Sequence, residues 1–480
     1  MTSLSHVPPR RVLFVSYLFP PTGGVGVHRV SKFVKYLPES DWNSSVLTVS
    51  NASVPLHDAS LVRDIPAGTL IRRAKTYEPG YALKAAVSGS KQDARQKNHL
   101  KDKLIRVVKN GVRQVANTLL QPDAQILWHP NAYREGMKLL ADTPHDAIVA
   151  TGPPFSSFLL GAKLSRKTGL PLILDYRDEW DISNEYWENK GHGRFANLIQ
   201  TRQQASVVRR ANLILATTPS SAAAIEEFAR RHGSRAKVSY VYNGFDSDDY
   251  PPISKQSQHR LSAPDEKFRL AFIGTLWNLN SIEPVVNALL KISREQPILA
   301  GSIELFLAGR RTPDQDAILD RLEQTPVTVV RYPFVSHDEA IEMMRSADAL
   351  LMLNSQLPKT QRIINAKTFE YMAAQRPMFV VAPRGDVWDI VSDLPGTTLC
   401  WPNDIDDIAE KLLLLVELHR CGEHFSGAVW DIARFERREL TRQLARFLDE
   451  TVEADLLFRG CLQGNRLTSM PLLERPGQSP

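Results

Sequence analysis

Short apolar runs rich in valine, isoleucine and leucine recur along the chain and alternate with stretches whose apolar positions repeat at helical spacing. The first series of runs lies at residues 11–16, 45–49, 147–151, 172–176, 213–217 and 238–242. A second series follows at residues 269–274, 303–309, 327–332, 349–354, 378–382 and 397–401. Such runs are typical of strands that are buried on both faces of a parallel sheet. The pattern therefore predicts an α/β fold with two sheets in tandem.

The stretch between the two series, residues 249–267, contains two adjacent prolines and few apolar residues, which is typical of a linker. Both halves open with a strand, a loop and a helix. The sequence therefore predicts an N-terminal domain over residues 8–248 and a C-terminal domain over residues 268–432. The cleft between two such domains is the expected ligand site.

The composition fits a soluble protein of more than one domain, with 480 residues of which 43% are hydrophobic and 23% are charged. Its cysteines, Cys400, Cys421 and Cys461, are spaced for neither a disulfide framework nor a zinc site, which favours a reducing compartment such as the cytoplasm. No apolar run approaches the roughly 18 residues that span a bilayer. The run that begins at Val12 is broken by Ser16 and prolines, so we interpret it as a strand rather than a signal peptide.

The positive charge of the chain is concentrated in one segment. Residues 91–115 carry eight basic and two acidic side chains, a surplus equal to the net charge of +6 of the whole chain. Apolar residues at helical spacing in this segment predict a basic amphipathic helix, inserted in the N-terminal domain at about residues 91–120. Two interpretations stay open: a solvated helix that packs on the domain, or a surface that contacts a membrane or an anionic acceptor. Because the excess of positive charge is confined to this one segment, it does not indicate a nucleic-acid partner.

A glycine-rich turn, FPPTGGVGVHR at residues 19–29, joins the first predicted strand to its helix. Gly23, Gly24 and Gly26 let the backbone approach a ligand, and the following helix N-terminus offers free N–H groups to an anion such as a diphosphate. A plain tight turn is the alternative. The turn is not the dinucleotide fingerprint of dehydrogenases, because Arg29 stands where the third glycine belongs.

Several segments share a further pattern, namely the glycine-rich turn followed by TGPPFSSFLLGAKL (151–164), LPLILDYRDEW (170–180), VYNGFD (241–246), FIGTLW (272–277) and NAKTFEYMAAQRPMFVVAP (365–383). In this order they resemble the retaining GT-B glycosyltransferases of the large family that includes sucrose-phosphate synthase and bacterial polysaccharide-assembly enzymes. The likeness is greatest to a branch of bacterial surface-polysaccharide transferases. It runs from about Arg11 to Asp449.

The resemblance implies two Rossmann-like domains that face a cleft. The N-terminal domain is expected to bind the acceptor and the C-terminal domain a nucleoside diphosphate sugar, without a metal ion or another cofactor. Residues 433–455 resemble the closing helix that returns to the N-terminal domain in this family, and residues 456–480 are then left as a flexible tail.

The donor site implied by the resemblance departs from the family pattern in two places. The family has two glutamates separated by seven residues; Glu370 matches the second, which binds ribose, whereas Arg362 stands in place of the first. Gly274 and Thr275 match the loop after the first strand of the C-terminal domain, but the arginine and lysine that many relatives carry there are absent. Arg310, its neighbour Arg311 and Lys367 are the remaining candidates to pair with the donor phosphates, with a simple surface role as the alternative.

On the acceptor side, the segment DYRDEW (175–180) follows a buried strand, so its polar side chains are expected at the mouth of the cleft. Arg177 and Asp178 are the catalytic candidates, because a carboxylate can position an acceptor hydroxyl or take its proton. Trp180 is a candidate wall for sugar stacking, and Gly152 and Ser156 of the upstream loop face the same way. An Asp–Arg pair that only fixes the loop is the alternative.

One motif has metal-like spacing, DSDD at residues 246–249, but it falls at the boundary between the domains, and we predict no metal site there. The sequence as a whole predicts a retaining transferase that moves a hexose-type sugar onto a glycan or lipid-linked acceptor in surface-polysaccharide or glycolipid assembly. The expected location is the cytoplasm, in contact with the inner face of the membrane if residues 91–115 dock there. Two alternatives stay open: a nucleotide-sugar epimerase of the same fold, and a non-catalytic scaffold subunit that binds nucleotide sugars.

Overall fold

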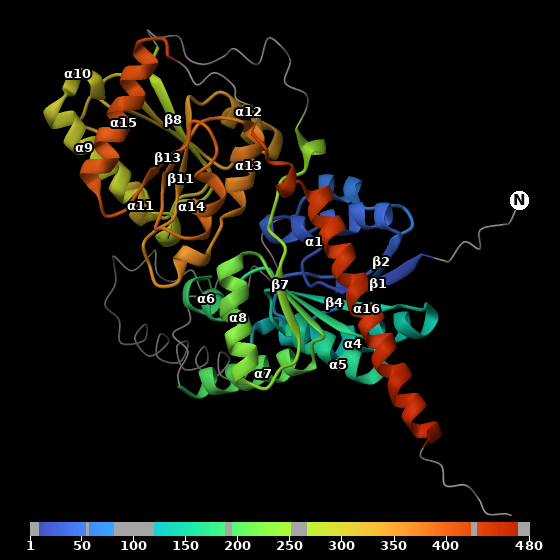
Figure 1. The fold of residues 1–480 in the computed structure, drawn as a ribbon. Helices are drawn as coiled ribbons and strands as arrows, with labels where there is room; N and C mark the ends of the chain where they lie inside the picture. The colour runs from blue at the N-terminus through green and yellow to red at the C-terminus, as the bar shows by residue number, and fades with distance from the viewer. Residues whose placement is uncertain are drawn as a thin grey trace, which may run out of the picture.

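The computed structural model describes residues 9–53, 57–80, 120–187, 194–250, 266–423 and 430–468. They form two α/β domains, each built on a parallel sheet (Figure 1). The basic helix predicted at residues 91–115 lies outside the described residues, as do residues 251–265 of the predicted linker.

The N-terminal sheet has the strand order β3-β2-β1-β4-β5-β6-β7, and all neighbouring strands are parallel. Its strands are β1 (Arg10–Val15), β2 (Trp42–Val49), β3 (Leu70–Ala74), β4 (Ala147–Gly152), β5 (Leu172–Tyr176), β6 (Leu213–Ala216) and β7 (Lys237–Tyr240). The helices of this domain are α1 (Val25–Tyr36), α4 (His129–Asp142), α5 (Ser156–Thr168), α6 (Trp180–Ile182), α7 (Arg194–Arg210) and α8 (Pro219–Arg231). Strands β4 and β5 are buried at every position, as their apolar runs predict.

The C-terminal sheet repeats this plan with the order β10-β9-β8-β11-β12-β13. Its strands are β8 (Phe268–Ile273), β9 (Ile303–Ala308), β10 (Thr328–Tyr332), β11 (Ala349–Leu353), β12 (Met378–Val381) and β13 (Thr398–Cys400). Its helices are α9 (Glu283–Glu295), α10 (Pro297–Ala300), α11 (Pro313–Asp320), α12 (His337–Arg345), α13 (Ala366–Ala374), α14 (Asp386–Val391) and α15 (Ile405–Arg420). Separate apolar clusters lie on the two sides of the sheet.

In each sheet the strand order reverses at one point, between β1 and β4 in the first domain and between β8 and β11 in the second. Loops diverge at such a point, so they leave a crevice at the carboxyl ends of the strands. The glycine-rich turn follows β1, and the loop with Gly274 and Thr275 follows β8. The topology therefore places both segments at the crevices where ligands of α/β proteins bind.

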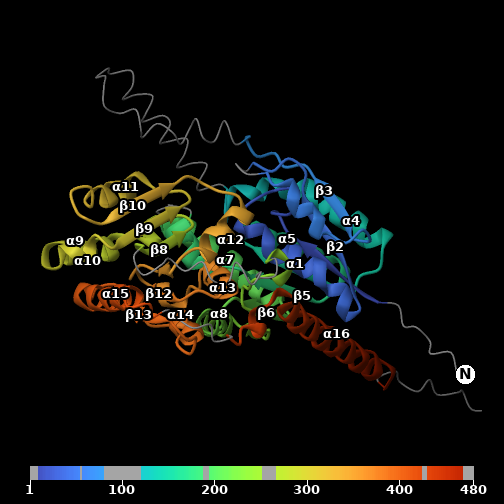
Figure 2. The same cartoon turned by 90° about the horizontal axis from the view of Figure 1, so that it is seen from above.

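A long terminal helix, α16 (Arg437–Thr468), returns from the second domain and lies along the first (Figure 2). Its apolar residues Leu440, Leu444 and Leu448 pack in one cluster with Val30 and Phe33 of α1. The helix continues past residue 455, where the sequence analysis ended it, so the beginning of the predicted flexible tail is helical. Within the described residues, no helix combines the length and the apolar character needed to cross a membrane.

The chain passes between the domains twice, and the two crossings pair with each other. Phe245 accepts a hydrogen bond from the backbone N–H of Arg437 at 2.8 Å and donates one to the carbonyl of Phe435 at 3.2 Å. The crossings approach so closely that a Cβ added at Gly244 would lie 2.1 Å from the carbonyl oxygen of Phe435. Only glycine fits this point of contact without displacing the backbone.

Candidate functional site

A cleft of about 850 Å³ lies between the domains and gathers most of the predicted site residues. Those of the first domain are Gly26, Arg177 and Asp178, and those of the second are Gly274, Thr275, Arg310, Lys367 and Glu370. The cleft is of the size that small-molecule sites have, and its polar groups come from both walls.

The remaining predicted residues lie outside the cleft. Trp180 is 1% exposed, its ring stacks on Phe155 at 4.4 Å between centroids, and its Nε1 donates to Gln200 at 2.9 Å. The wall for sugar stacking predicted at this tryptophan is therefore replaced by core packing, because the loop after β4 supplies an aromatic partner. Ser156 is fully buried at the start of α5.

The glycines outside the cleft have local packing roles. A Cβ added at Gly152 would lie 3.0 Å from the rings of Phe155 and Phe158. Gly24 caps the N-terminus of α1 with a φ of 101°, which L-residues rarely adopt. Gly23 and Gly24 form the turn, and only Gly26 reaches the cleft. Of the three glycines, the structure thus leaves one that a ligand can touch.

Glu370 lies on α13, whose first residues follow the loop after β11. Its carboxylate accepts a hydrogen bond from the hydroxyl of Tyr250, a residue of the first interdomain crossing. Burial raises the pKa of Glu370, and the nearby His337 and Arg437 together with the Tyr250 hydroxyl oppose this shift. A carboxylate fixed in this way at the cleft wall is suited to accept hydrogen bonds from hydroxyl groups of a ligand.

Lys367 lies one turn before Glu370 on the same helix, so both side chains reach the same wall. Its Nζ lies 3.9 Å from the ring centroid of Phe272, and a Cβ added at Gly274 would be 2.7 Å from it. Within the described part of the chain this enclosed ammonium has no hydrogen-bond partner, and burial lowers its pKa to about 7. A buried amine whose charged form lacks a hydrogen-bond partner is suited to bind an anion.

The two arginines after β9 differ in their surroundings. The Arg311 guanidinium donates to Asp316 at 2.9 Å and to two backbone carbonyls, so it holds the loop together. Arg310 is exposed, lies over the ring of Phe334 at 5.7 Å and lines the cleft. Of the two, Arg310 is the cation that faces a ligand.

Arg177 and Asp178 do not form an ion pair with each other, which was the alternative to a catalytic role. The Arg177 guanidinium donates to the carbonyl of Gly26 at 2.5 Å and to that of Pro153 at 2.6 Å, so it ties the start of α1 to the loops after β4 and β5. Among the described residues, no hydrogen bond to the Asp178 carboxylate occurs, although this residue lines the cleft. Burial raises its pKa, with Arg177 and Arg29 acting against the shift. A carboxylate with a raised pKa that faces a cleft is suited to accept a proton.

Two buried arginines of the site were missed by the sequence analysis. Arg29 is 1% exposed, and its Nε and Nη2 donate to Oδ1 of Asp175 at 3.0 and 2.9 Å, which fixes the end of β5. Its position in the glycine-rich motif, where another family has glycine, was the available signal. Arg437 at the start of α16 is 5% exposed and lines the cleft. Nothing local in the sequence distinguishes it from the other arginines of that helix.

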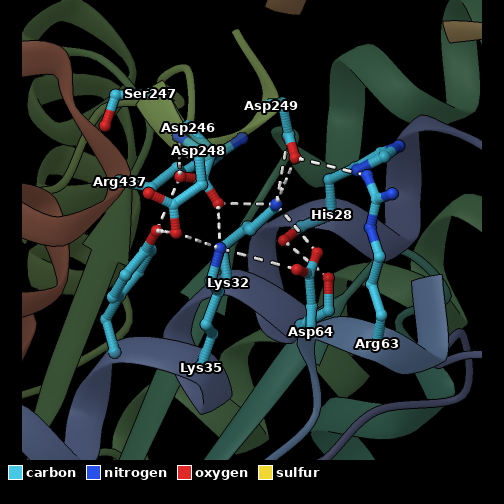
Figure 3. A network of polar contacts seen from close by, with 12 residues as sticks. His28, Lys32, Lys35, Arg63, Asp64, Asp246, Ser247, Asp248, Asp249 and Arg437 are labelled. Carbon is cyan, nitrogen blue, oxygen red and sulfur yellow. Dashed lines mark hydrogen bonds and ion pairs between the residues drawn. The ribbon is translucent and has the colours of Figure 1, made fainter. Parts of the chain in front are cut away.

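The DSDD motif belongs to a network of ion pairs with α1 (Figure 3). Lys32 contacts Asp64, Asp246 and Asp249 at 2.8, 2.6 and 3.0 Å, and Lys35 contacts Asp246 and Asp248. Hydrogen bonds from these lysines and from a tyrosine outweigh burial and hold the pKa of Asp246 well below its ordinary value. No cluster that could hold a metal ion occurs among the residues that the structure describes. The motif anchors the first interdomain crossing to the N-terminal domain.

Comparison with known proteins agrees with this architecture. Residues 24–244 match the family described as a glycosyl transferase 4-like domain. No curated protein sequence matches the chain significantly.

Several solved structures share the arrangement of both domains. HepE from Anabaena, solved with UDP and glucose, is 16% identical over 92% of this chain and 100% of its own, with a TM-score of 0.52. The N-terminal domain of trehalose-6-phosphate phosphatase from Candida albicans is 12% identical over 93% of this chain and 97% of its own, with a TM-score of 0.60. WaaG, a glycosyltransferase involved in lipopolysaccharide biosynthesis, is 13% identical over 91% of this chain and 99% of its own, with a TM-score of 0.51. At these identities the likeness shows the fold, and it confirms the predicted GT-B architecture.

Proposed function

We propose that this chain, with its GT-B fold and its N-terminal glycosyl transferase 4-like domain, is a retaining glycosyltransferase that takes a hexose-type sugar from a nucleoside diphosphate sugar. The observation that carries the proposal is the composition of the cleft. Lys367 and Glu370 lie on the wall formed by the second domain, and Asp178 lies on the wall formed by the first. The wall of the second domain thus offers a nucleotide a cation and a carboxylate that can accept hydrogen bonds from its hydroxyl groups. The wall of the first domain offers a carboxylate to the hydroxyl of the incoming acceptor.

The chemistry of the wall formed by the second domain supports a donor site there. Glu370 accepts the ribose hydroxyls, as the matching glutamate does in the family that the sequence resembles. Lys367 meets the diphosphate together with backbone N–H groups of the loop at Gly274 and Thr275, and Arg310 adds charge at the mouth of the cleft. Lys367 reaches Gly274 from α13, so it supplies the positive charge that the loop after β8 itself lacks.

The reaction proposed for this site is displacement on one face of the sugar. The acceptor oxygen forms the new bond to the anomeric carbon while the bond from that carbon to the diphosphate oxygen breaks. The diphosphate leaves with the electron pair of the broken bond, and the hydroxyl proton passes to it or to Asp178. Lys367 stabilises the negative charge that develops on the leaving diphosphate. This stabilisation is preorganised, because the side chain is in position before the reaction begins.

We assign the acceptor to surface-polysaccharide or glycolipid assembly. Support comes from the branch that the sequence resembles and from the role of WaaG in lipopolysaccharide biosynthesis. Such acceptors are carried on lipids at the cytoplasmic face of a membrane, which suits a cytoplasmic protein with a basic segment at residues 91–115. Neither a metal ion nor another cofactor takes part in this scheme.

The proposal is tested by incubating the purified protein with a panel of nucleoside diphosphate sugars. A transferase releases free sugar slowly in the absence of an acceptor and retains the anomeric configuration when an acceptor is added. Conversion to an isomeric nucleotide sugar instead identifies an epimerase. Binding of a nucleotide sugar with neither reaction, in the presence of lipid-linked acceptors, identifies a scaffold subunit.

The binding of the nucleotide sugar is expected to weaken about tenfold between pH 6 and pH 8. The pKa of Lys367 is lowered to about 7 in the free protein, and a bound diphosphate raises it because the ammonium gains a partner. Binding is therefore strongest below pH 7, where the ammonium is already formed, and it weakens as the pH rises above 7 because a proton must be taken up. Titration calorimetry at several pH values measures this effect.

The control for this prediction is the variant K367M, which keeps the aliphatic stem beside Phe272. It is expected to bind more weakly below pH 7 and to show no pH dependence in this range. A nucleotide sugar is the proper ligand, because its diphosphate does not titrate between pH 6 and pH 8. An unchanged pH dependence in K367M would assign the effect to another group.

A further inference from the structure

A second set of contacts joins the two domains, apart from the two chain crossings. On the N-terminal side it involves α6 and the start of α8, and on the C-terminal side the loop from Leu357 to Ile363 and the start of α14. The loop from Leu357 to Ile363 borders the cleft, since Ile363 lines it. Contacts at this place hold the two walls of the cleft at a set separation.

Arg362 is at the centre of these contacts. Its Nη1 donates to Oε2 of Glu179 at 3.1 Å, and the hydroxyl of Thr218 donates to its carbonyl at 2.9 Å. The other oxygen of Glu179 accepts a hydrogen bond from the hydroxyl of Ser221 at 2.7 Å. The side chains of Glu179 and Arg362 are 8% and 28% exposed, so water screens the ion pair only in part.

Neighbouring groups strengthen the same contact. The hydroxyl of Ser220 donates to Asp386 at 2.7 Å, and that of Tyr186 donates to the carbonyl of Pro358 at 2.8 Å. An apolar cluster around Ile182 and Leu279 brings side chains of both domains together. The polar contacts therefore surround a small interdomain core, which fixes their geometry.

The position of the ion pair along the chain connects it to both walls of the site. Glu179 directly follows Asp178, the carboxylate of the acceptor wall. Arg362 directly precedes residues 363–367, which line the donor wall and end at Lys367. Arg362 does not line the cleft itself, although it stands where the relatives carry the first of their two glutamates.

We propose that Glu179 and Arg362 form a positioning pair that sets the Asp178 carboxylate against the bound donor, in place of a direct contact between residue 362 and the donor sugar. This inference rests on the proposed function. The pair acts on the alignment of the two walls and leaves the nucleotide contacts of the second domain intact. Its loss is therefore expected to lower turnover and to leave the affinity for the nucleotide unchanged.

Charge exchange tests the pair. The variants R362E and E179R each place like charges together and are expected to lower kcat by about tenfold, while the Kd for the nucleotide stays within about twofold of the wild type. The double variant E179R/R362E restores the attraction and is expected to recover most of kcat. A role in stability alone would change the melting temperature without this split between kcat and Kd, so the melting temperature of each variant is measured as well.

The matched control is R331A. Arg331 forms an ion pair with Asp320 at 2.7 Å inside the second domain, and its exposure of 26% is close to that of Arg362. This variant loses an ion pair of similar kind away from the domain boundary, and wild-type turnover is expected.

Small-angle X-ray scattering gives a measurement that does not depend on activity. The single variants R362E and E179R are expected to have a larger radius of gyration than the wild type, and the double variant is expected to return to the wild-type value. If the proposed function fails, scattering still decides whether the pair joins the domains. Single variants with unchanged scattering and unchanged kcat, or a double variant no better than the singles, would overturn the inference.

Discussion

The variant D178N is expected to lower kcat/KM for the acceptor by about 10²–10⁴-fold, the range that removal of a positioned acid–base group usually gives. The change keeps the shape of the side chain and removes its capacity to take a proton. Because Lys367 and Glu370 lie on the opposite wall, the affinity for the nucleotide is expected to stay unchanged. Initial rates at varied acceptor concentration, together with nucleotide titrations, measure the two effects separately.

The Asp178 carboxylate does not hold the loops around it together, so its replacement is expected to affect the reaction and not the folding. Arg177 donates its hydrogen bonds to the carbonyls of Gly26 and Pro153, so neutralising Asp178 leaves the contacts between these loops intact. The burial that raises the pKa of Asp178 also predicts an acidic limb in the rate profile, with activity lost as the pH falls through that pKa. D178N should lack this limb.

The control variant is D181N, which changes an exposed aspartate of α6 outside the cleft. It is expected to have wild-type kinetics. If D178N keeps full activity and shows only a lower melting temperature, the carboxylate fixes the loop and has no role in the reaction.

The sequence predicted the strands best where one local pattern decided the outcome. Strands such as β4 and β5 are buried on both faces, so their apolar runs are continuous and easily found. Strand β3 escaped prediction because it lies at the edge of its sheet, and its sequence LIRRA leaves most positions exposed or half-buried. Glu370 was a candidate because it matches the second glutamate of the family pattern, and Lys367 because it lies three residues before it; both line the same wall of the cleft.

Contacts between distant segments explain what the sequence did not predict. Trp180 follows a strand, as a residue of a ligand site does, but Phe155 of another loop covers its ring. Arg362 was noticed as a departure from the family pattern, yet its partner Glu179 belongs to the other domain. The charges of the DSDD motif were visible, whereas their neutralisation by Lys32 and Lys35 depends on how α1 packs beside the crossing. These outcomes are set by tertiary packing, which one sequence does not reveal.

The variant E370A is expected to raise the Kd for the donor nucleotide by about 10²-fold while the fold stays intact. A hydrogen bond to a charged group contributes about 1.5–3 kcal/mol, and a carboxylate that accepts the ribose hydroxyls loses such bonds when it is truncated. Glu370 lies at the cleft wall with Tyr250 beside it. Calorimetric titration with UDP, GDP, ADP and TDP first identifies the base that the wild type prefers.

The sharpest form of this test uses a nucleotide without ribose hydroxyls. If Glu370 binds the ribose, the wild type should lose about as much affinity for the 2′,3′-dideoxy nucleotide as E370A loses for the normal one, and E370A should not distinguish the two ligands. E342A, which changes an exposed glutamate of α12, is the matched control and should bind like the wild type. If E370A instead raises the Kd by the same factor for both ligands, relative to the wild type, the carboxylate supports the shape of the wall and does not contact the ribose. The two measurements together separate a direct contact from an indirect one, because only a direct contact disappears with the hydroxyls.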